Sequence, residues 1–523
     1  MKITIDKKFL VIPVCYDQNK KTNLIFKNSS NGEVVFNLDV CLDPNETFTK
    51  YYVDFERFKG MTLETEGGPD GIVLETSDGD NTVFYSEPDR PKTHFSAKKG
   101  WINDPNGLIY HNGIYHLYFQ HNPAGRMWGN MHWGHAESTD LIHWVEKDEA
   151  MFPDETGTMY SGSAILDEKN LTGLGTTENP PILFYYTAAG GENTLSQGKP
   201  YTQCLAYSTD NGKTLVKYDG NPVVPHIGYA NRDPKVIWSD EMNCYYMALY
   251  LVDNEFLLYT SDDLLHWEKK QQINLPNVAE CPDFYPLTVK ETGERFWILV
   301  GAHDWYLVGK LNEEGMFCPV QECKRHHWGD SSYAAQSYSG TGDRRIKVAW
   351  NNFCIPNNYF NSSMNIPTEM TLVKDGDSYS LCANPIKEIE SLYSGTKKIG
   401  GIKVAEGSAQ TISTNKGAKD ITFVIKGGKK YHIDFHGTTM SFDNNGCCMS
   451  AANCCLPSYP GEDGVKVRVI ADTTGFEIFT GEGRAFAVAG FMANMDATDF
   501  TVVTEEGDIE IASFEATDLK SIW

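Results

Sequence analysis

The chain is 523 residues long and carries a net charge of -25, with 45 Lys and Arg against 70 Asp and Glu. This balance argues against a nucleic-acid-binding surface and against docking on anionic membranes, because both need clustered basic side chains. Aromatic residues make up 12% of the chain and charged residues 22%, which is typical of a strand-rich globular protein with little disorder.

The length predicts more than one domain, and residues 1–88 predict a small β module. Strand-like segments lie at Phe9–Val14, Val34–Leu42 and Gly71–Leu74, with Gly, Asp and Asn turns between them. In Val34–Leu42, apolar residues recur at every second position, the period of a half-buried strand. We expect a jelly roll or a sandwich, followed by an exposed connector at Ser86–Lys92, where prolines and charges cluster.

A turn that presents a carboxylate follows this connector. Trp101–Gly107 reads Trp-Ile-Asn-Asp-Pro-Asn-Gly and precedes strand-like residues, so we expect Asp104 at a strand boundary with its side chain in a cavity. Taken alone, such a run is more often a surface turn. Two further segments, Asn231–Pro234 and Glu280–Asp283, again place an acid beside a proline at a strand boundary.

An internal repeat lies within residues 93–375. Ser138–Trp144 and Ser261–Trp267 share the pattern Ser-x-Asp-Leu-x-His-Trp, and Ser208–Thr214 is a degenerate third copy. Each copy follows a strand-like segment, as expected where one strand of a β-propeller blade turns into the next. The spacing is about one blade per copy and predicts about five blades. The innermost strands of such a fold surround one axis, which brings together carboxylates that are far apart in sequence.

The C-terminal part predicts a short helix and a second β domain. Asn384–Leu392 has a proline in its first turn and apolar residues on one side, which favours a linker helix within residues 376–394. Residues 395–523 contain strictly alternating segments between Gly-rich turns and predict an antiparallel β-sandwich. The predicted fold class is therefore all-β: a five-bladed β-propeller with a C-terminal β-sandwich and a small extra N-terminal β domain.

Six ordered blocks resemble glycoside hydrolase family 32, the β-fructofuranosidases, fructanases and invertases. They are the three acid-bearing segments together with Tyr118–Pro123, Trp133–Ala136 and Tyr160–Ala164. The resemblance implies hydrolysis of terminal non-reducing β-fructofuranosides, such as sucrose, fructooligosaccharides, inulin or levan, with retention through a covalent fructosyl-enzyme intermediate. It also implies five blades. It does not cover residues 1–88, which we expect either to bind sugar or to pack as a cap.

The resemblance also implies roles for individual residues. Asp104 is expected to be the nucleophile, Glu280 the acid and base, and Asp233 a stabiliser of the transition state. The negative charges of Asp104 and Asp233 favour a proton on Glu280. Arg232 is expected to hold substrate hydroxyls. Cys281 is expected to sit beneath Glu280 and tune it, or else to be a small buried apolar side chain.

A neutral sugar is bound through hydrogen bonds and ring stacking rather than ion pairs. The expected substrate-binding residues are Asn103, Gln120, Trp128, Ser163 and Tyr333, of which Trp128 and Tyr333 could instead pack within a blade. Trp101 and Trp328 are further candidates for apolar ring faces. The partner is a small or oligomeric β-fructoside, and no nucleic acid or membrane is expected.

The sequence predicts no metal and no cofactor. Cys447–Cys448 and Cys454–Cys455 lack the usual Cys-x-x-Cys spacing, and His326–His327 lacks a metal-binding helix pattern. Met1–Lys8 has no apolar signal core, and the 13 cysteines are scattered, which favours a reduced, cytoplasmic setting unless a leader has been removed.

Two alternatives remain at this stage. A fructosyltransferase would use the same carboxylates, with a sugar in place of water as the acceptor. A non-catalytic fructan-binding protein would need no acid and nucleophile together, so the presence of Asp104, Asp233 and Glu280 disfavours it. Chain-length preference, linkage, use of phosphorylated sucrose and oligomeric state are not predicted.

Overall fold

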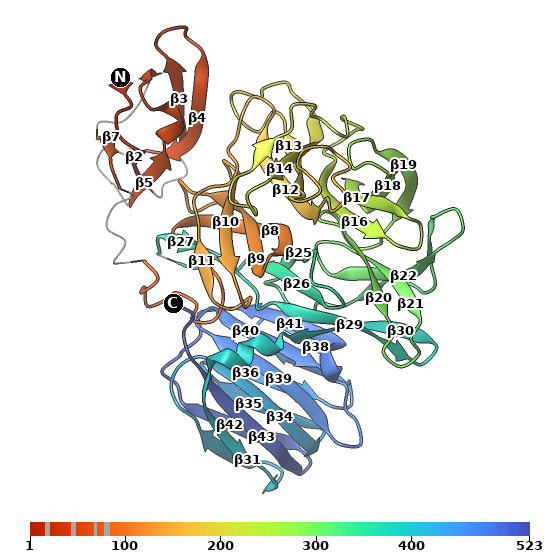
Figure 1. Ribbon diagram of the computed structural model, residues 1–523. Coiled ribbons are helices and arrows are strands. Elements are labelled where there is room, and N and C mark those ends of the chain that lie inside the picture. The colour runs from red at the N-terminus through yellow and green to blue at the C-terminus, as the bar shows by residue number, and fades with distance from the viewer. Residues whose placement is uncertain (16–20, 43–48, 67–70, 78–83, 357) are drawn as a thin grey trace.

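The computed structural model describes residues 1–15, 21–42, 49–66, 71–77, 84–356 and 358–523, and nearly all regular structure in these ranges is β-strand (Figure 1). Three groups of sheets follow one another along the chain: a small N-terminal module, a propeller and a C-terminal sandwich. This arrangement confirms the predicted fold class. None of the helices in the described ranges is long and apolar enough to cross a membrane.

The N-terminal module consists of two small antiparallel sheets. Its elements are β1 (Lys2–Thr4), β2 (Phe9–Val14), β3 (Lys21–Asn28), β4 (Val34–Cys41), β5 (Thr49–Asp54), the 3-10 helix η2 (Glu56–Phe58), β6 (Thr62–Glu66) and β7 (Val73–Glu75). One sheet has the order β1-β6-β3-β4 and the other β5-β2-β7. Phe55 packs edge to face against Phe26, Phe36 and Phe58 at centroid distances of 5.0 to 5.6 Å, so an aromatic cluster holds the module together.

The propeller is built from five antiparallel meanders arranged around one axis (Figure 1). Blade one contains β8 (Gly100–His111), β9 (Ile114–Asn122), β10 (His132–Ser138) and β11 (Trp144–Glu146). Blade two contains β12 (Thr158–Leu166), β13 (Ile182–Ala189), β14 (Tyr201–Ser208) and β15 (Val216–Lys217). Blade three contains β16 (Arg232–Ser239), β17 (Cys244–Val252), β18 (Glu255–Ser261) and β19 (Glu268–Asn274).

Blade four contains β20 (Asp283–Thr288), β21 (Arg295–Val300), β22 (Trp305–Leu311) and β23 (Phe317–Pro319), with β24 (Lys324–Arg325) beside β22. Blade five contains β25 (Tyr333–Ser337), β26 (Arg345–Asn351), β29 (Thr368–Asp375) and β30 (Ser378–Pro385), with β28 (Ser363–Met364) beside β26. The short strand β27 (Phe360–Asn361) pairs in parallel with β8. The first strands of the blades contact one another in the cycle β8, β12, β16, β20, β25 and back to β8, which closes the ring.

The repeated Ser-x-Asp-Leu-x-His-Trp segments form the turn between the third and fourth strands of blades one and three. Asp140 accepts hydrogen bonds from the N–H groups of Ile142 and His143 at 3.0 and 2.8 Å. The equivalent Asp263 accepts from Leu265 and His266 at 2.9 and 2.8 Å. The leucines between them, at positions 141 and 264, adopt left-handed φ angles of 66° and 68°, so the carboxylate holds a strained turn in place.

The linker helix predicted over residues 376–394 differs from the structure. β30 pairs with β29 along its whole length and therefore belongs to blade five. A two-residue turn joins these strands, and Gly376 supplies a φ of 60° within it. Only η3 (Lys387–Leu392) is helical, as a 3-10 helix whose Ile389 and Leu392 are buried. The prediction was too long because the hairpin signal at Gly376 was not recognised.

The C-terminal sandwich consists of two antiparallel sheets around an apolar core. The first sheet contains, in spatial order, β31 (Tyr393–Ile399), β43 (Ile509–Leu519), β34 (Lys419–Gly427), β39 (Val465–Asp472), β40 (Gly475–Thr480) and β41 (Ala485–Gly490), with β32 (Ile402–Val404) beside β43 and η4 (Gly481–Gly483) before β41. The second contains β33 (Ala409–Ser413), β42 (Asp499–Glu506), β35 (Lys430–Phe435), β36 (Thr438–Asp443), β37 (Cys448–Ala451) and β38 (Cys454–Pro457).

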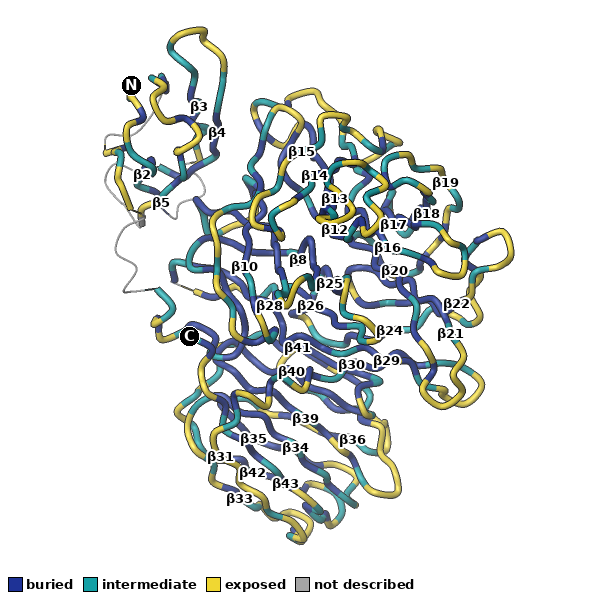
Figure 2. The backbone as a smooth tube through the Cα atoms, viewed as in Figure 1, coloured by how far each residue is buried: buried dark blue, intermediate teal, exposed yellow. Residues whose placement is uncertain are grey.

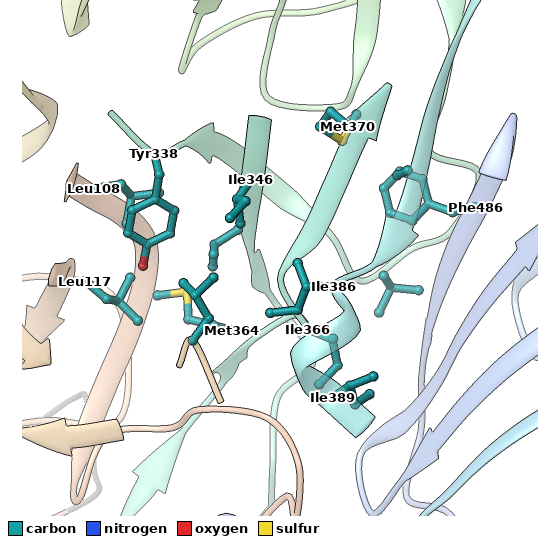
Figure 3. Close-up of a cluster of buried hydrophobic side chains, with 14 of the residues drawn as sticks. Leu108, Leu117, Tyr338, Ile346, Met364, Ile366, Met370, Ile386, Ile389 and Phe486 are labelled. Carbon is teal, nitrogen blue, oxygen red and sulfur yellow. The ribbon is translucent and has the colours of Figure 1, made fainter. Parts of the chain in front are cut away.

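One continuous hydrophobic core joins the propeller to the sandwich. Leu108 and Ile346 of the propeller, Ile386 and Ile389 of the linker, and Phe486 of β41 belong to this cluster (Figure 3). Figure 2 shows the backbone buried on both sides of this boundary. A shared apolar core of this kind favours two domains that move as one body.

The connector at residues 86–92 is partly buried, with Glu87, Arg90 and Pro91 inside the protein, where an exposed segment was predicted. Arg90 is fully buried, and its guanidinium forms a bidentate ion pair with Glu87 at 2.6 and 2.7 Å. It also lies 3.6 Å from the ring centroid of Phe360. The charges that suggested solvent exposure therefore satisfy one another inside the protein.

A buried ionic cluster follows this connector at the boundary between propeller and sandwich. His94 bonds to Asp472 at 2.8 Å and to Glu477 at 3.0 Å, and the N–H groups of Lys92 and Thr93 donate to Asp472 at 2.9 and 2.8 Å. Although burial alone acts against it, bonding to the two carboxylates raises the pKa of His94 to about 10. Burial is likewise overcome at Asp472, where His94 and the N–H donors hold the carboxyl pKa below its ordinary value.

Asp472→Asn is expected to lower the free energy of unfolding by about 3 kcal/mol near pH 6, because the buried His94 cation loses one of its two counter-charges. The contribution of His94 is complete below its unfolded pKa of about 6.5 and is lost as pH rises through about 10. The contribution of Asp472 is present above an unfolded value of about 3.9 and is lost at lower pH. Thermal unfolding from pH 4 to 11 measures the effect, which should be largest near pH 6.

The matched control is Asp496→Asn, whose carboxylate is 82% exposed and pairs with Lys416 at the surface. It should leave the unfolding curve almost unchanged, because exposed ion pairs contribute little. Equal losses in the two variants would contradict a stabilising role for the buried cluster.

Candidate active site

A cavity of about 340 Å³ lies on the propeller where the first strands of the blades begin. Its wall includes eight of the residues predicted from sequence: Asn103, Asp104, Gln120, Trp128, Arg232, Asp233, Glu280 and Tyr333. The remaining wall residues are Tyr160, Ser161, Tyr201 and Trp350. The propeller axis therefore brings the three predicted carboxylates into one site.

The strand registers become irregular at this cavity. Shifts occur between Ile102 and Pro105 in blade one, Met159 and Gly162 in blade two, Arg232 and Lys235 in blade three, and Tyr333 and Gln336 in blade five. Bulges of this kind re-aim side chains and are frequent beside active sites. Strain is also present, because Asp233 and Glu280 have left-handed φ angles of 66° and 63°.

Asp104 is held by neighbouring donors on the first strand of blade one and on blade two. Asn103 Nδ2 donates to its Oδ1 at 3.1 Å, and Ser161 Oγ donates to its Oδ2 at 2.5 Å. Gln120 Nε2 in turn donates to Ser161 Oγ at 3.3 Å. Burial raises the pKa of Asp104 above its ordinary value, while the bonds from Ser161 and Asn103 oppose the rise. The carboxylate is thus fixed in direction before any ligand arrives.

Arg232 connects the other two carboxyl groups. Its guanidinium forms an ion pair with Glu280, and its Nε lies 3.7 Å from Asp233 Oδ2. The hydroxyl of Tyr333 donates to the second oxygen of Glu280. Arg232 also lies over the ring of Tyr250, 4.6 Å from its centroid, which fixes the plane of the guanidinium.

The cavity retains a proton near neutral pH. Burial is the main cause that raises the pKa of Asp233 to about 7, with the charges of Asp104 and Glu280 reinforcing it and Arg232 opposing it. One guanidinium cannot balance three ionised carboxyl groups in a buried site. Asp233 is therefore protonated in part of the molecules near neutral pH.

Cys281 lies beneath the cavity, yet its thiol faces two carboxyl groups other than that of Glu280. The Sγ atom donates to Asp104 Oδ2 and to Asp233 Oδ2 at 3.5 Å each, and the backbone N–H donates to Asp233 at 3.0 Å. Left-handed φ angles at both 280 and 281 turn the two side chains apart. The sequence placed Cys281 beneath Glu280, whereas its thiol contacts Asp104 and Asp233. Burial, with Asp104 and Asp233, raises the pKa of the thiol, which stays a donor.

Ser163 lies outside the cavity, contrary to the expectation that it binds substrate. Its hydroxyl donates to the carbonyl of Pro234 at 2.8 Å and accepts from the N–H of Val236 at 2.9 Å, which links β12 to β16. Ser161 occupies the wall instead. Ser161 lies within the register shift between Met159 and Gly162, whereas Ser163 lies in the regular ladder beyond it and therefore deeper along the strand. Alternation in the sequence predicts on which face of a strand a side chain lies, but it does not predict how far along the propeller axis the side chain lies.

Two tryptophans proposed as ring faces are also placed elsewhere. Trp101 is 8% exposed, donates its indole N–H to Asn103 at 3.0 Å and packs edge to face against Trp350. The backbone N–H of Trp328 donates to the backbone carbonyl of Phe486 in the sandwich at 2.8 Å, and Trp328 is not part of the cavity wall. The aromatic wall comes instead from Trp128, Tyr160, Tyr201, Tyr333 and Trp350.

Three of these aromatic residues were missed as site residues by the sequence reasoning. Tyr160 opens a block that was quoted for the resemblance, Tyr201 opens a strand-like segment, and Trp350 ends another. Tyr160 contacts both Trp128 and Tyr201 edge to face, at centroid distances of 6.1 and 5.7 Å. Their places near the ends of strand-like segments were the available signal, because the carboxylates were also expected at strand boundaries.

One group of possible metal ligands occurs among the described residues. His116, His135 and Glu137 present ligand atoms within 4.8 Å of one another, outside the cavity wall. The two imidazoles are hydrogen-bonded to each other at 3.1 Å, and Glu137 pairs with Lys147 at 2.8 Å. These contacts satisfy the same atoms that a metal would need, so we interpret the group as a buried structural pair.

Comparison with known proteins gives a family match over the propeller. The model for the glycosyl hydrolases family 32 N-terminal domain matches residues 94–385. An extracellular exo-inulinase from Aspergillus awamori is 30% identical over 523 residues, which cover 84% of this chain and 96% of the relative. A levanase from Bacillus subtilis (strain 168) is 28% identical over 505 residues, which cover 86% of this chain and 73% of the relative.

Solved structures show the same fold. The crystal structure of the exo-inulinase from Aspergillus awamori superposes with a TM-score of 0.75 at 27% identity, over 84% of this chain and 100% of that one. A fructofuranosidase variant from Schwanniomyces occidentalis, complexed with fructosylnystose, superposes with a TM-score of 0.74 at 24% identity, over 84% of this chain and 99% of that one. The second match supports the fold alone.

Proposed function

This chain belongs to glycosyl hydrolase family 32, and on that premise we propose that it is a retaining β-fructosidase that releases terminal fructose from the non-reducing ends of β-fructofuranosides. Its class, a glycoside hydrolase acting on fructosides, follows from the family match and from the levanase and exo-inulinase relatives. The retaining mechanism and the release of terminal fructose are inferred from the residues of the cavity.

The observation that carries the proposal is the meeting of Asp104, Asp233 and Glu280 in one cavity with a single guanidinium. Glycoside hydrolysis needs one carboxylate and one protonated carboxyl group on opposite sides of the scissile bond. Asp104 is oriented by the bonds from Asn103 and Ser161, as a nucleophile must be, and we assign the role of proton donor to Glu280, another carboxyl group of the cavity wall.

In the first step, an oxygen of Asp104 attacks C2 of the bound fructosyl unit. Glu280 transfers its proton to the glycosidic oxygen, so the bond from C2 to that oxygen breaks and the alcohol leaves neutral. Bonds from Asn103 and Ser161 hold Asp104 in line with C2. Asp104 and the sugar are then joined by an ester bond.

In the second step, Glu280 accepts a proton from water, whose oxygen attacks C2 and displaces Asp104. Two inversions give net retention. The bond from Tyr333 and the ion pair with Arg232 hold Glu280 in the cavity wall, so that the same group can act in both steps. Asp233 faces the sugar and stabilises the positive charge that develops on the ring.

The wall of the cavity suits a neutral sugar. Five aromatic side chains offer faces to furanose C–H groups, and Asn103, Gln120 and Ser161 offer hydrogen-bonding groups. Sucrose, fructooligosaccharides, inulin and levan each present a terminal fructosyl unit to such a site. A cytoplasmic setting stays a prediction.

The test is to incubate the protein with sucrose, inulin and levan and to measure free glucose and fructose over time. Equal release from sucrose supports hydrolysis, whereas an excess of glucose indicates transfer to another sugar. Fructose as the first product from polymers supports exo-action, and early oligosaccharides would contradict it. Addition of methanol should give methyl β-fructofuranoside, and the α-anomer would refute retention.

A further inference from the structure

The loop between β9 and β10 is held by the N-terminal module. Ala124, near the start of this loop, is 2% exposed and belongs to the hydrophobic core of the module. Phe152, on a later propeller loop, packs against the same core. Residues 1–93 lie outside the segment that the family model matches, so the module is an addition to the family's propeller in this chain.

The other side of the loop is held by the segment that follows β26, which includes Ile355 and β27. Asn361 Nδ2 donates to the carbonyl of Arg126 at 2.9 Å, and Arg126 donates to the carbonyl of Ile355 at 2.5 Å. Within the loop, Asn122 Nδ2 donates to the carbonyl of Met127 at 2.8 Å. The chain up to residue 127 is therefore fixed by the module on one side and by the propeller on the other.

Trp128 follows directly and faces both structures. It forms part of the wall of the catalytic cavity, and it also borders a small space of about 20 Å³ lined by Lys21, Asp39, Val40 and Cys41 of the module. A space of that size indicates close packing between the loop and the β3–β4 hairpin. The indole is 52% exposed, so its position depends strongly on the backbone that carries it.

We propose that the N-terminal module helps to build the active site, because its β3–β4 hairpin and its core position Trp128 as one wall of the fructosyl site. This inference rests on the proposed function for the identity of the ligand. Val40 and Ala124 are the positioning residues, and Trp128 is the residue that touches the sugar. The module therefore acts on substrate binding without contributing a catalytic group.

The expected kinetic signature follows from the place of Trp128 in the wall. An indole against the sugar contributes similar binding energy to the bound substrate and to the transition state, so a displaced indole raises KM more than it lowers kcat. A module that served only as a packing cap would change the stability of the chain and leave KM for sucrose unchanged.

The experiment compares Val40→Ala with Val53→Ala. Both remove two methyl groups from the same buried core, but only Val40 borders the space beneath Trp128. We expect Val40→Ala to raise KM for sucrose about threefold with kcat nearly unchanged, and Val53→Ala to leave KM unchanged. Equal rises in KM for the two variants would overturn the proposal.

A double-mutant cycle with Trp128→Ala tests whether the effect passes through the indole. Ala124→Asp places a charge in the core of the module and is expected to raise KM about tenfold. In the Trp128→Ala background, Ala124→Asp and Val40→Ala should add nothing further. Full additivity would overturn the proposal. If Ala124→Asp does not fold, as judged by circular dichroism, the valine pair decides alone.

Failure of the proposed function is distinguishable from failure of this inference. If the unaltered protein releases no fructose from any fructoside, the function proposal falls. Fructose binding, followed by tryptophan fluorescence in the same valine variants, then still tests the position of Trp128. If the unaltered protein is active and Val40→Ala matches Val53→Ala, only the inference falls.

Discussion

Asp104→Asn is expected to lower the rate of fructose release from sucrose by about four orders of magnitude or more. The amide cannot form the ester bond to C2, although it fills the same volume and its one oxygen still accepts a hydrogen bond from Asn103 or Ser161. Initial rates from sucrose, measured by coupled glucose detection, give the size of the loss. The melting temperature should change little, because the substitution removes a negative charge that is buried in the folded protein.

Asp140→Asn is the matched control for this substitution. It makes the same chemical change in blade one, in a carboxylate that serves only the turn between β10 and β11. We expect it to lower the melting temperature slightly and to leave kcat unchanged. A comparable loss of kcat in both variants, or residual activity of Asp104→Asn above about one per cent of the unaltered rate, would exclude Asp104 as the nucleophile.

Glu280→Gln is expected to lower the turnover of sucrose by about a thousandfold, because the leaving alkoxide is no longer protonated. A nitrophenyl β-fructofuranoside has a leaving group that needs little protonation, so bond cleavage in this variant should be much less impaired with that substrate. The measurement is a burst of nitrophenol, followed by a slow phase in which the ester bond awaits an activated water.

Asp233→Asn serves as the comparison for Glu280→Gln. In the proposed mechanism Asp233 stabilises the charge on the sugar ring, so its loss should slow the hydrolysis of sucrose and of the nitrophenyl substrate by similar factors. The same ratio between the two substrates for both variants would show that Glu280 does not protonate the leaving group. A burst only in Glu280→Gln would assign the proton transfer to Glu280.

The fold was predictable because its signals are local. Alternation marked the strands, and the acid of each Ser-x-Asp-Leu-x-His-Trp repeat makes the hydrogen bonds that hold a left-handed leucine in the turn. The linker helix was overextended because the two-residue hairpin turn at Gly376 was missed. The connector around Arg90 was misjudged because its partner, Glu87, satisfies the charge within the protein.

The site was predictable where chemistry and strand position coincide. An acid beside a proline at a strand boundary identified Asp104, Asp233 and Glu280, and the structure brings all of them into one cavity. The sequence did not predict how deep a side chain lies along the propeller axis or which neighbour it contacts, as Ser163 and Cys281 show. Register shifts and left-handed backbone angles determine both. The sequence also did not predict that the N-terminal module lies close to Trp128, because the two segments share no sequence pattern that would link them.

The closed ring has a consequence for how activity arises during synthesis. The three carboxyl groups belong to blades one, three and four, and blade five must meet β8 before the cavity has its last wall. A nascent chain that ends after β19 already contains Asp104 and Asp233, yet it lacks Glu280 and the last two blades, which complete the cavity wall. Catalysis is therefore expected to begin only when blade five has packed against blade one. The appearance of enzyme activity during synthesis would then indicate that the propeller ring has closed.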